Sequence, residues 1–138
     1  MGILDNLFGS APQMGAAPKG SPFSLSTSFR PMRLAGRSSN SVDLLLNLQN
    51  VSSSPQMCSV VVELPKALGF DGVGLHKTKE LRLGTLDSAA RKDFAVPIHA
   101  NSQTLPGLYR LKLTVYSHYR DYAHVLNSVS KILELRVV

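Results

Sequence analysis

The side chains best suited to recognition or chemistry are concentrated in residues 116–124, near the end of the chain. Tyrosine and arginine supply large contact areas and dominate the hot spots of protein interfaces, and loops on a rigid scaffold are a common place for recognition. We therefore predict a partner-binding hairpin. Its contact residues are Tyr116, His118, Tyr119, Arg120, Tyr122 and His124. The competing interpretation is a long hairpin that packs its tyrosines on neighbouring loops.

Histidine spacing gives no support for a metal centre. The four histidines are His76, His99, His118 and His124. None of them forms a short-spaced ligand pair with another histidine, a cysteine or a carboxylate. His118 and His124 can meet across a hairpin with Asp121 at its tip, which would make a loose metal site. Polar loop residues explain the same pattern, so we predict no metal site.

The remaining catalytic patterns are missing from the sequence. No Gly-x-Ser-x-Gly elbow supports a hydrolase triad, and the glycines at residues 72–74 lack the longer pattern of a phosphate-binding loop. Aspartate and glutamate residues are spread singly, so no acid–base pair stands out. We therefore predict a protein that is not an enzyme, with no catalytic residues and no cofactor.

Length, cysteine content and charge restrict the class of protein. A chain of 138 residues is one domain by length, and the single cysteine, Cys58, excludes an internal disulfide. No apolar run approaches the roughly 20 residues of a membrane span, and no secretory signal is recognisable. A cytoplasmic protein is the resulting prediction. The net charge of +6 is spread from Lys19 to Arg136 without a basic block, which argues against nucleic-acid binding.

The start of the chain differs in composition from the rest. Its apolar residues have the spacing of one helical stripe, and these residues are Ile3, Leu4, Leu7 and Phe8. Residues 9–21 are small, rich in proline and glycine, and almost uncharged, as in a flexible linker. We predict a flexible N-terminal segment at 1–21, with a short amphipathic helix as an option, and a folded domain at 22–138. The stripe could make a peripheral contact with a membrane.

The hairpin requires strands to position it, and residues 105–115 show the clearest strand pattern. Tyr109, Leu111 and Leu113 alternate with polar neighbours after a Pro-Gly turn. Seven such segments, separated by turn signals, predict an all-β fold, a seven-stranded immunoglobulin-like antiparallel β-sandwich. Tyr109 occupies the position where such sandwiches often tie a corner with a tyrosine hydroxyl, although an ordinary core tyrosine fits equally well. The predicted strands are 23–30, 42–49, 58–64, 79–83, 93–99, 109–115 and 125–138.

Two irregularities refine this pattern. The first predicted strand exposes Ser24, Ser26 and Ser28 and carries no charged residue before its end, so an added strand from another chain could pair with it, including in a homodimer. The alternation shifts between Val129 and Leu133, which predicts a bulge there.

Four pieces of the sequence carry a family resemblance. They are the apolar strand ending in asparagine at 42–50, Leu64-Pro65, the strand and turn at 83–91, and Pro106-Gly107-Leu108-Tyr109 before the alternating strand. Together they resemble the immunoglobulin-like modules of bacterial and archaeal proteins called CARDB-type or alpha-galactosidase-associated modules. The resemblance implies a seven-stranded spacer or binding module without catalytic residues. The chain departs from that family at 86–91, which lack the usual Pro-Gly turn, and in having no signal for secretion.

These observations lead to two functional hypotheses. The first is a non-enzymatic protein-interaction or scaffold module of unknown partner, using residues 116–124 and an edge strand. A remoter likeness to arrestin-type sandwiches would suit such a cytosolic scaffold. The alternative is a basic module that binds an anionic polymer or a membrane surface through Arg30, Arg33, Arg37 and the amphipathic start.

Overall fold

Alternation of apolar and polar side chains folds most of the chain into β-strands. The computed structural model describes residues 22–71 and 76–138, and these contain eight strands and no helix. In this part of the chain, accordingly, no helix is long and apolar enough to span a bilayer. The strands are β1 (Phe23–Arg30), β2 (Arg33–Leu34), β3 (Asn40–Asn50), β4 (Gln56–Glu63), β5 (Thr78–Leu86), β6 (Arg91–Ala100), β7 (Gly107–His118) and β8 (Val125–Val137). The stripe and linker predicted at 1–21, and the glycines at residues 72–74, lie outside the described residues.

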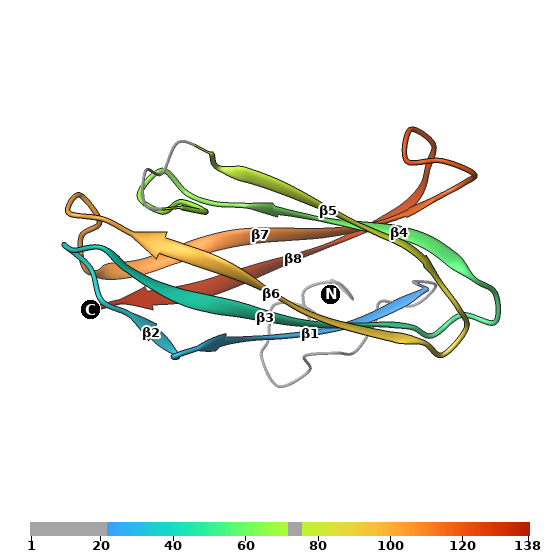
Figure 1. Ribbon diagram of the computed structural model, residues 1–138, viewed down its shortest axis with the longest axis horizontal. Helices are drawn as coiled ribbons and strands as arrows, with labels where there is room; N and C mark the ends of the chain where they lie inside the picture. Colours follow the sequence, from blue (N-terminus) through green and yellow to red (C-terminus); the bar gives the residue numbers. More distant parts are fainter. Residues whose placement is uncertain (1–21, 72–75) are drawn as a thin grey trace, which may run out of the picture.

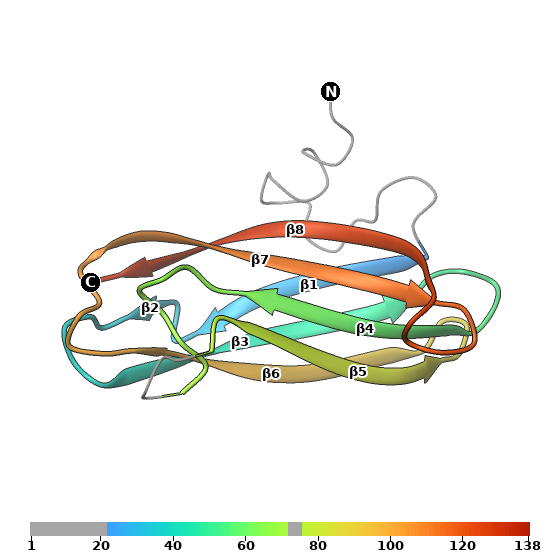
Figure 2. The same ribbon diagram turned by 90° about the horizontal axis from the view of Figure 1, so that it is seen from above.

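The strands form two stacked sheets (Figure 1). One sheet has three strands in the order β1-β3-β6, and the other has five in the order β2-β8-β7-β4-β5. Neighbouring strands are antiparallel except β2 and β8, which are parallel. Seen from above, β1 and β8 lie along one long side of the sandwich, and β5 and β6 along the other (Figure 2). The predicted all-β sandwich is therefore confirmed.

β7 supplies the centre of the core. Its inward side chains Leu111, Leu113 and Val115 are fully buried, as their alternation predicts. Full burial of one such side chain contributes about 1.5 to 3 kcal/mol. Cys58 on β4 also lies in the core, and burial raises the pKa of its thiol to about 11. The other large, fully buried side chains include Leu34, Leu44, Leu48, Leu68, Ile98 and Leu135.

The count of seven strands was wrong, because the described residues contain an eighth. β2 lies between the predicted strands 23–30 and 42–49, in residues for which the alternation predicts no strand. The Leu34 side chain is buried, the Val138 N–H donates to the Leu34 carbonyl over 2.8 Å, and the Gly36 N–H donates to the Val138 carbonyl over 2.9 Å. With these bonds the chain passes from β1, at the edge of the three-stranded sheet, to β2, at the edge of the five-stranded sheet. A strand of two residues is too short to show any alternation in the sequence.

The bulge predicted between Val129 and Leu133 was also wrong. β7 and β8 keep one register through this region, and their register shifts instead at Ser117/His118. The alternation breaks because Lys131, a charged residue, occupies an inward position of β8. A charged residue at an inward position makes the alternation of apolar and polar residues look shifted by one residue, although the strand has no bulge.

Lys131 lies between the two sheets. The residue is only 4% exposed, and its Nζ donates a hydrogen bond to Thr27 Oγ1 on β1 over 3.0 Å. Desolvation lowers the pKa of its ammonium group below the ordinary 10.5. Among the described residues, β2 covers the outer edge of β8 only at Arg136 and Val137. An inward charge on such a largely unpaired edge discourages the addition of a further strand, because the charge would be buried more deeply.

Tyr109 ties a corner of the sandwich, as one of its two interpretations predicted. Its hydroxyl donates a hydrogen bond of 2.6 Å to the carbonyl of Leu105, four residues earlier. The ring meanwhile packs against the core. The bond fixes the turn that leads into β7, the strand that all inner packing depends on.

Replacing Tyr109 with phenylalanine should lower the free energy of unfolding by about 1 kcal/mol, because it removes this one hydrogen bond and keeps the ring. Urea denaturation monitored by circular dichroism measures the loss. The control is Tyr119→Phe, whose exposed hydroxyl makes no hydrogen bond within the described residues. Equal losses in the two variants would contradict the corner assignment.

Replacing Lys131 with methionine should raise the free energy of unfolding, on the order of 1 kcal/mol at neutral pH, because it removes the cost of burying an ammonium group. Between the lowered pKa of folded Lys131 and 10.5, the unfolded chain binds more protons, so this residue's penalty falls as pH rises. The stability difference between the two proteins should therefore shrink at alkaline pH. Parallel urea titrations from neutral to alkaline pH measure it, and a difference that grows with pH would contradict the burial of the charge.

Candidate functional site

The hairpin between β7 and β8 projects from one end of the sandwich (Figure 1, orange-red loop). Three backbone bonds close it. Tyr119 N–H donates to the His124 carbonyl over 2.8 Å, Asp121 N–H donates to the Tyr119 carbonyl over 2.8 Å, and His124 N–H donates to the Asp121 carbonyl over 3.2 Å. Arg120 has a φ of 70°, in the left-handed region that a tight turn requires. The predicted site residues divide into two groups here. Tyr116, His118 and Tyr122 form the hairpin base, and Tyr119, Arg120 and His124, with Asp121, form the hairpin tip.

The hairpin base is fixed to β4 and β5. His118 is 6% exposed, and its Nε2 lies 2.7 Å from the Ser59 hydroxyl. The Tyr122 ring meets the His118 ring edge-on at 5.0 Å, and the guanidinium of Arg82 lies 4.7 Å from the centre of the Tyr122 ring. Aromatic and cation–π contacts of this kind each contribute about 0.5 to 1.5 kcal/mol. Strands distant in sequence thus hold the hairpin in one position.

Gly84 on β5 completes this attachment. Its N–H donates to the Tyr122 hydroxyl over 2.9 Å, and its φ of 75° lies in the region that favours glycine. The register between β4 and β5 shifts beside it, at Cys58/Ser59. This irregularity turns one backbone donor of β5 toward the hairpin instead of along the sheet.

The Ser59 and His118 pair has the spacing of a nucleophile and its base, but its surroundings do not suit catalysis. Ser59 is 1% exposed and Tyr122 packs on the histidine, so the hydroxyl is shielded from solvent. Within the described residues, His118 Nδ1 and the Ser117 hydroxyl have no hydrogen-bond partner, so no third group orients the imidazole. This geometry supports anchoring of the hairpin.

The hairpin tip is exposed and internally ordered. Tyr119 is 51% exposed, and the Arg120 guanidinium lies 5.1 Å from the centre of its ring. His124 Nδ1 lies 2.7 Å from an Asp121 carboxylate oxygen, and the Ala123 N–H donates to the same oxygen over 3.0 Å. The bond to His124 lowers the pKa of Asp121. The tip therefore presents one aromatic ring and one guanidinium on a loop held by its own bonds.

The structure therefore separates residues that the sequence grouped as one surface. Tyr119, Arg120 and His124 are exposed, whereas His118 is buried between Ser59 and the Tyr122 ring. His118 and His124 do not make a metal site with Asp121, and the part of the chain in view contains no group of three or more residues that could hold a metal ion. Sequence reasoning missed Ser59, Arg82 and Gly84 because they lie on other strands, and no local pattern links them to the hairpin.

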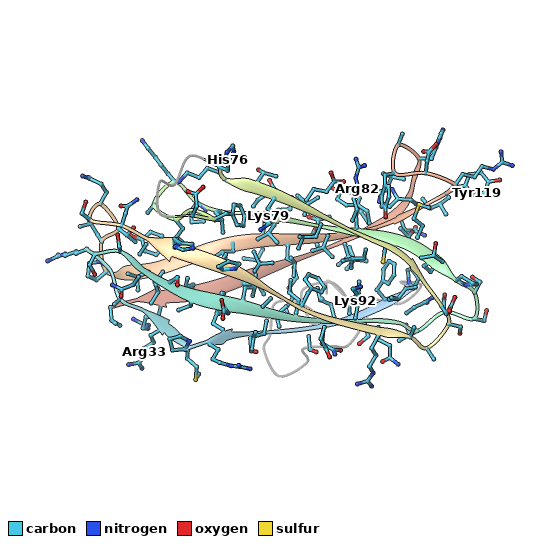
Figure 3. The ribbon with its side chains drawn as sticks, viewed as in Figure 1. Arg33, His76, Lys79, Arg82, Lys92 and Tyr119 are labelled. Atoms are coloured by element: carbon cyan, nitrogen blue, oxygen red, sulfur yellow. The ribbon has the colours of Figure 1, made fainter. Side chains whose placement is uncertain are left out.

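The predicted basic residues lie away from the hairpin. Arg33 and Tyr119 are at opposite ends of the sandwich, and Arg82 is at the hairpin end (Figure 3). Arg33 pairs in register with Arg136, and both are exposed. Arg37 lies in the loop after β2, where its N–H donates to the Thr104 carbonyl over 2.7 Å.

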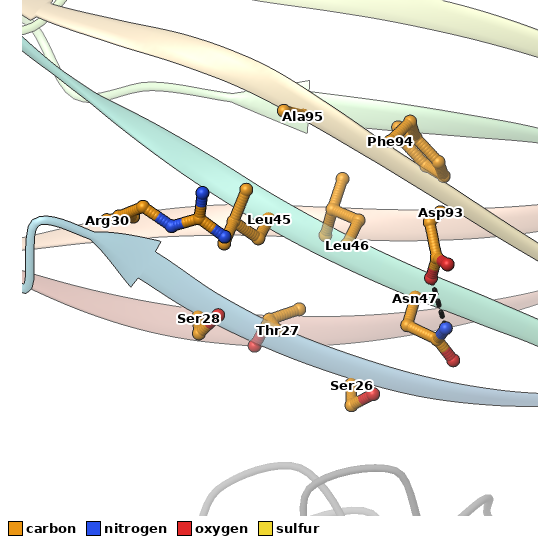
Figure 4. Close-up of a pocket in the computed structure, with 10 residues that line it drawn as sticks. All are labelled: Ser26, Thr27, Ser28, Arg30, Leu45, Leu46, Asn47, Asp93, Phe94 and Ala95. Carbon is orange, nitrogen blue, oxygen red and sulfur yellow. Dashed lines mark hydrogen bonds between the residues drawn. The ribbon is translucent and has the colours of Figure 1, made fainter.

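A shallow groove of about 430 Å³ crosses the outer face of the three-stranded sheet (Figure 4). Leu45 and Ala95 form apolar parts of its lining, Arg30 lies at one end, and the Asn47 amide donates to Asp93 near the other. Ser26 and Ser28 also line it, but no general base is within hydrogen-bond distance of either hydroxyl among the described residues. The groove can bind polar groups, and it shows no activated nucleophile.

Comparisons with known proteins bear on the fold alone. No protein-family model and no curated protein matches the sequence. Among solved structures, a FixG-related protein from Vibrio parahaemolyticus has a TM-score of 0.55 at 9% identity, covering 85% of this chain and 97% of that one. Alkylpurine DNA glycosylase AlkC from Pseudomonas fluorescens, bound to DNA, has a TM-score of 0.50 at 16% identity, covering 86% of this chain and 31% of that one. What these proteins share with this chain is a fold.

A CARDB domain is also among the similar structures. The domain, from a Pyrococcus furiosus protein in complex with di-metal ions, has a TM-score of 0.48 at 14% identity, covering 84% of this chain and 87% of that one. This value is too low to assign the chain to the CARDB family. The comparisons therefore leave the chain without an assigned family.

Replacing Tyr122 with phenylalanine should release the hairpin base, because the Gly84 N–H loses its acceptor while the ring remains. We expect a loss of about 1 to 2 kcal/mol and faster hydrogen exchange at the Gly84 amide. Tyr116→Phe is the matched control, since the Tyr116 hydroxyl makes no hydrogen bond within the described part of the chain. Unchanged exchange at Gly84 in Tyr122→Phe would contradict the anchoring role.

Proposed function

We propose that the protein is a non-enzymatic interaction module on an immunoglobulin-like sandwich, with the hairpin tip as its main contact surface and an edge strand as its second. The observation that carries this proposal is the division of the hairpin. Its base is bound to Ser59, Gly84 and Arg82, while its tip exposes Tyr119 and Arg120. A rigid support with an exposed aromatic and cationic end is typical of a recognition loop.

The immunoglobulin-like assignment is supported by the connections between strands. The chain passes from β1 in one sheet to β2 in the other, where β2 pairs parallel to the last strand. The hydroxyl of Tyr109 ties the turn before β7, as tyrosine corners do in sandwiches of that class. Domains of this architecture present loops at their two ends, and the hairpin lies at one of them.

The ordering of the hairpin tip favours binding. Bonds to Asp121 and the positive φ of Arg120 hold the loop in one shape before any partner arrives, so little conformational entropy remains to be lost. Tyrosine adds a large contact area with few rotatable bonds, and arginine adds a planar set of donors for carboxylates. A protein surface with an apolar depression beside an acidic group is the complement of this tip.

The alternative, a basic module for an anionic polymer or membrane surface, is supported by one feature. Arg33 and Arg136 are adjacent and exposed, and neither forms an ion pair within the described residues. Nearby Arg110, however, is paired with Glu134. Substitutions in the hairpin tip and in the arginine pair distinguish the two functions, because these two surfaces lie at opposite ends of the sandwich.

Replacing Tyr119 and Arg120 together with alanine should abolish partner capture, while changing the melting temperature by less than about 2 °C, since both side chains are exposed. Affinity capture from an extract of the source cells, followed by quantitative mass spectrometry, measures this. The matched control replaces Met32 and Arg33, an exposed apolar and arginine pair at the other end. If only the control loses capture, and capture falls steeply with salt, the alternative function replaces the proposed one.

A further inference from the structure

β1 is the edge strand of the three-stranded sheet, and β8 runs along the same long side of the sandwich (Figure 2). In the part of the chain that the structure describes, β2 covers the outer edge of β8 only at Arg136 and Val137. The direction of the β1 peptide groups follows from one bond, in which the Val51 N–H donates to the Pro22 carbonyl over 2.8 Å. In an antiparallel ladder, every second residue makes both of its bonds to the same neighbour. Ser26 and Ser28 therefore bond to β3, and Leu25, Thr27 and Phe29 direct their N–H and C=O groups to the side away from β3, where no strand of the described residues lies.

β1 is the less protected of these two strands. It carries no charged side chain before Arg30 at its end, whereas β8 carries Lys131, Glu134 and Arg136. Charged residues on an outer strand prevent the pairing of further strands. An extended segment from another molecule would therefore add to β1 in preference to β8.

Lys131 determines which segment fits. Its ammonium group lies behind the centre of β1, bonded to the hydroxyl of Thr27, and it makes no salt bridge with any described residue. An ammonium group has three donors, so this single hydroxyl leaves hydrogen-bonding capacity unused. A strand added to β1 places the side chain opposite Thr27 on the same inward face, beside that ammonium group.

We propose that the open edge of β1 binds an extended acidic segment of a partner protein, whose inward aspartate or glutamate pairs with Lys131. This inference rests on the proposed function in using an edge strand as a contact surface, and it identifies the strand and the chemistry of its partner. An apolar side chain at that position would bury the ammonium group without compensation. A carboxylate would neutralise it, and it would add a charge-assisted hydrogen bond.

A second copy of this chain would not fit in this way. β1 contains no aspartate or glutamate, so pairing two β1 strands would bring two Lys131 ammonium groups toward one seam with no opposite charge. The net charge of +6 works in the same direction, since it favours an acidic partner over another copy.

The test uses the full chain labelled with ¹⁵N and a short synthetic peptide. The peptide has threonine at its outward positions, valine at its inward positions and one central inward glutamate; a second peptide has glutamine in place of that glutamate. We expect the glutamate peptide to bind about tenfold more tightly. Its binding should slow hydrogen exchange at the amides of Leu25, Thr27 and Phe29, and leave Ser26 and Ser28 unchanged as internal controls.

Two variants test the role of Lys131. Lys131→Met should bind both peptides equally, because it has no charge to pair, and Lys131→Arg should keep the preference for glutamate. Equal binding of the two peptides to the natural protein would overturn the proposal. So would protection of Ser128, Ser130 and Ile132 on β8, the absence of peptide binding, or a dimer in light scattering that excludes the peptide.

This experiment is independent of the hairpin. A chain with Tyr119 and Arg120 replaced should bind the glutamate peptide as the natural protein does. Loss of partner capture by that chain, together with failure of the peptide to bind β1, would retain the hairpin function and remove the strand-binding site. If the peptide binds and the hairpin substitutions do not affect partner capture, the strand-binding site is retained and the hairpin function is removed.

Discussion

The burial of alternate side chains of β7 between the two sheets is the constraint that the rest of the structure depends on. Leu111, Leu113 and Val115 point inward, so the residues between them must face solvent or a covering loop. A shift of register by one residue would exchange the two sets. The bond from Tyr109 to Leu105 at one end and the irregularity at Ser117/His118 at the other confine that register.

The position of the hairpin follows from the same constraint. Because Ser117 is still inward, the chain reaches the outer face at His118, beside Ser59 of β4. The hairpin then turns over β4 and β5. There the Tyr122 hydroxyl accepts a hydrogen bond from the Gly84 N–H, and the Tyr122 ring contacts the Arg82 guanidinium. The exposed tip is thus a consequence of where the last inward residue of β7 lies.

Much of this fold is predictable from sequence because alternation is a local property. Strands with a regular pattern, such as β3 and β7, are recognised from their own residues, and the turn before Tyr109 indicates the corner. Other features are not local. β2 is too short to show an alternation of apolar and polar residues. The buried Lys131 interrupts the alternation of β8 although the strand is regular there. The division of the hairpin into base and tip depends on Ser59 and Gly84, which contact it only after folding. Sequence therefore located the hairpin and could not divide its base from its tip.

Two buried polar residues, Asn50 and Lys131, differ in how fully the surrounding residues meet their hydrogen-bonding capacity. Asn50 is fully buried, yet its amide donates to the Leu86 and Ser54 carbonyls and its oxygen accepts from Ser52, so every bond that it needs comes from the neighbouring turns. Lys131 is buried to almost the same degree, and within the described residues its ammonium group has one partner, the Thr27 hydroxyl. The difference is one of position. Asn50 lies where two loops close over it, whereas Lys131 lies between β8 and β1, whose outer edges pair with no described strand along most of their length. A buried charge with unused hydrogen-bond donors is costly unless another group pairs with it, and this cost is the reason why we propose an acidic partner for this edge.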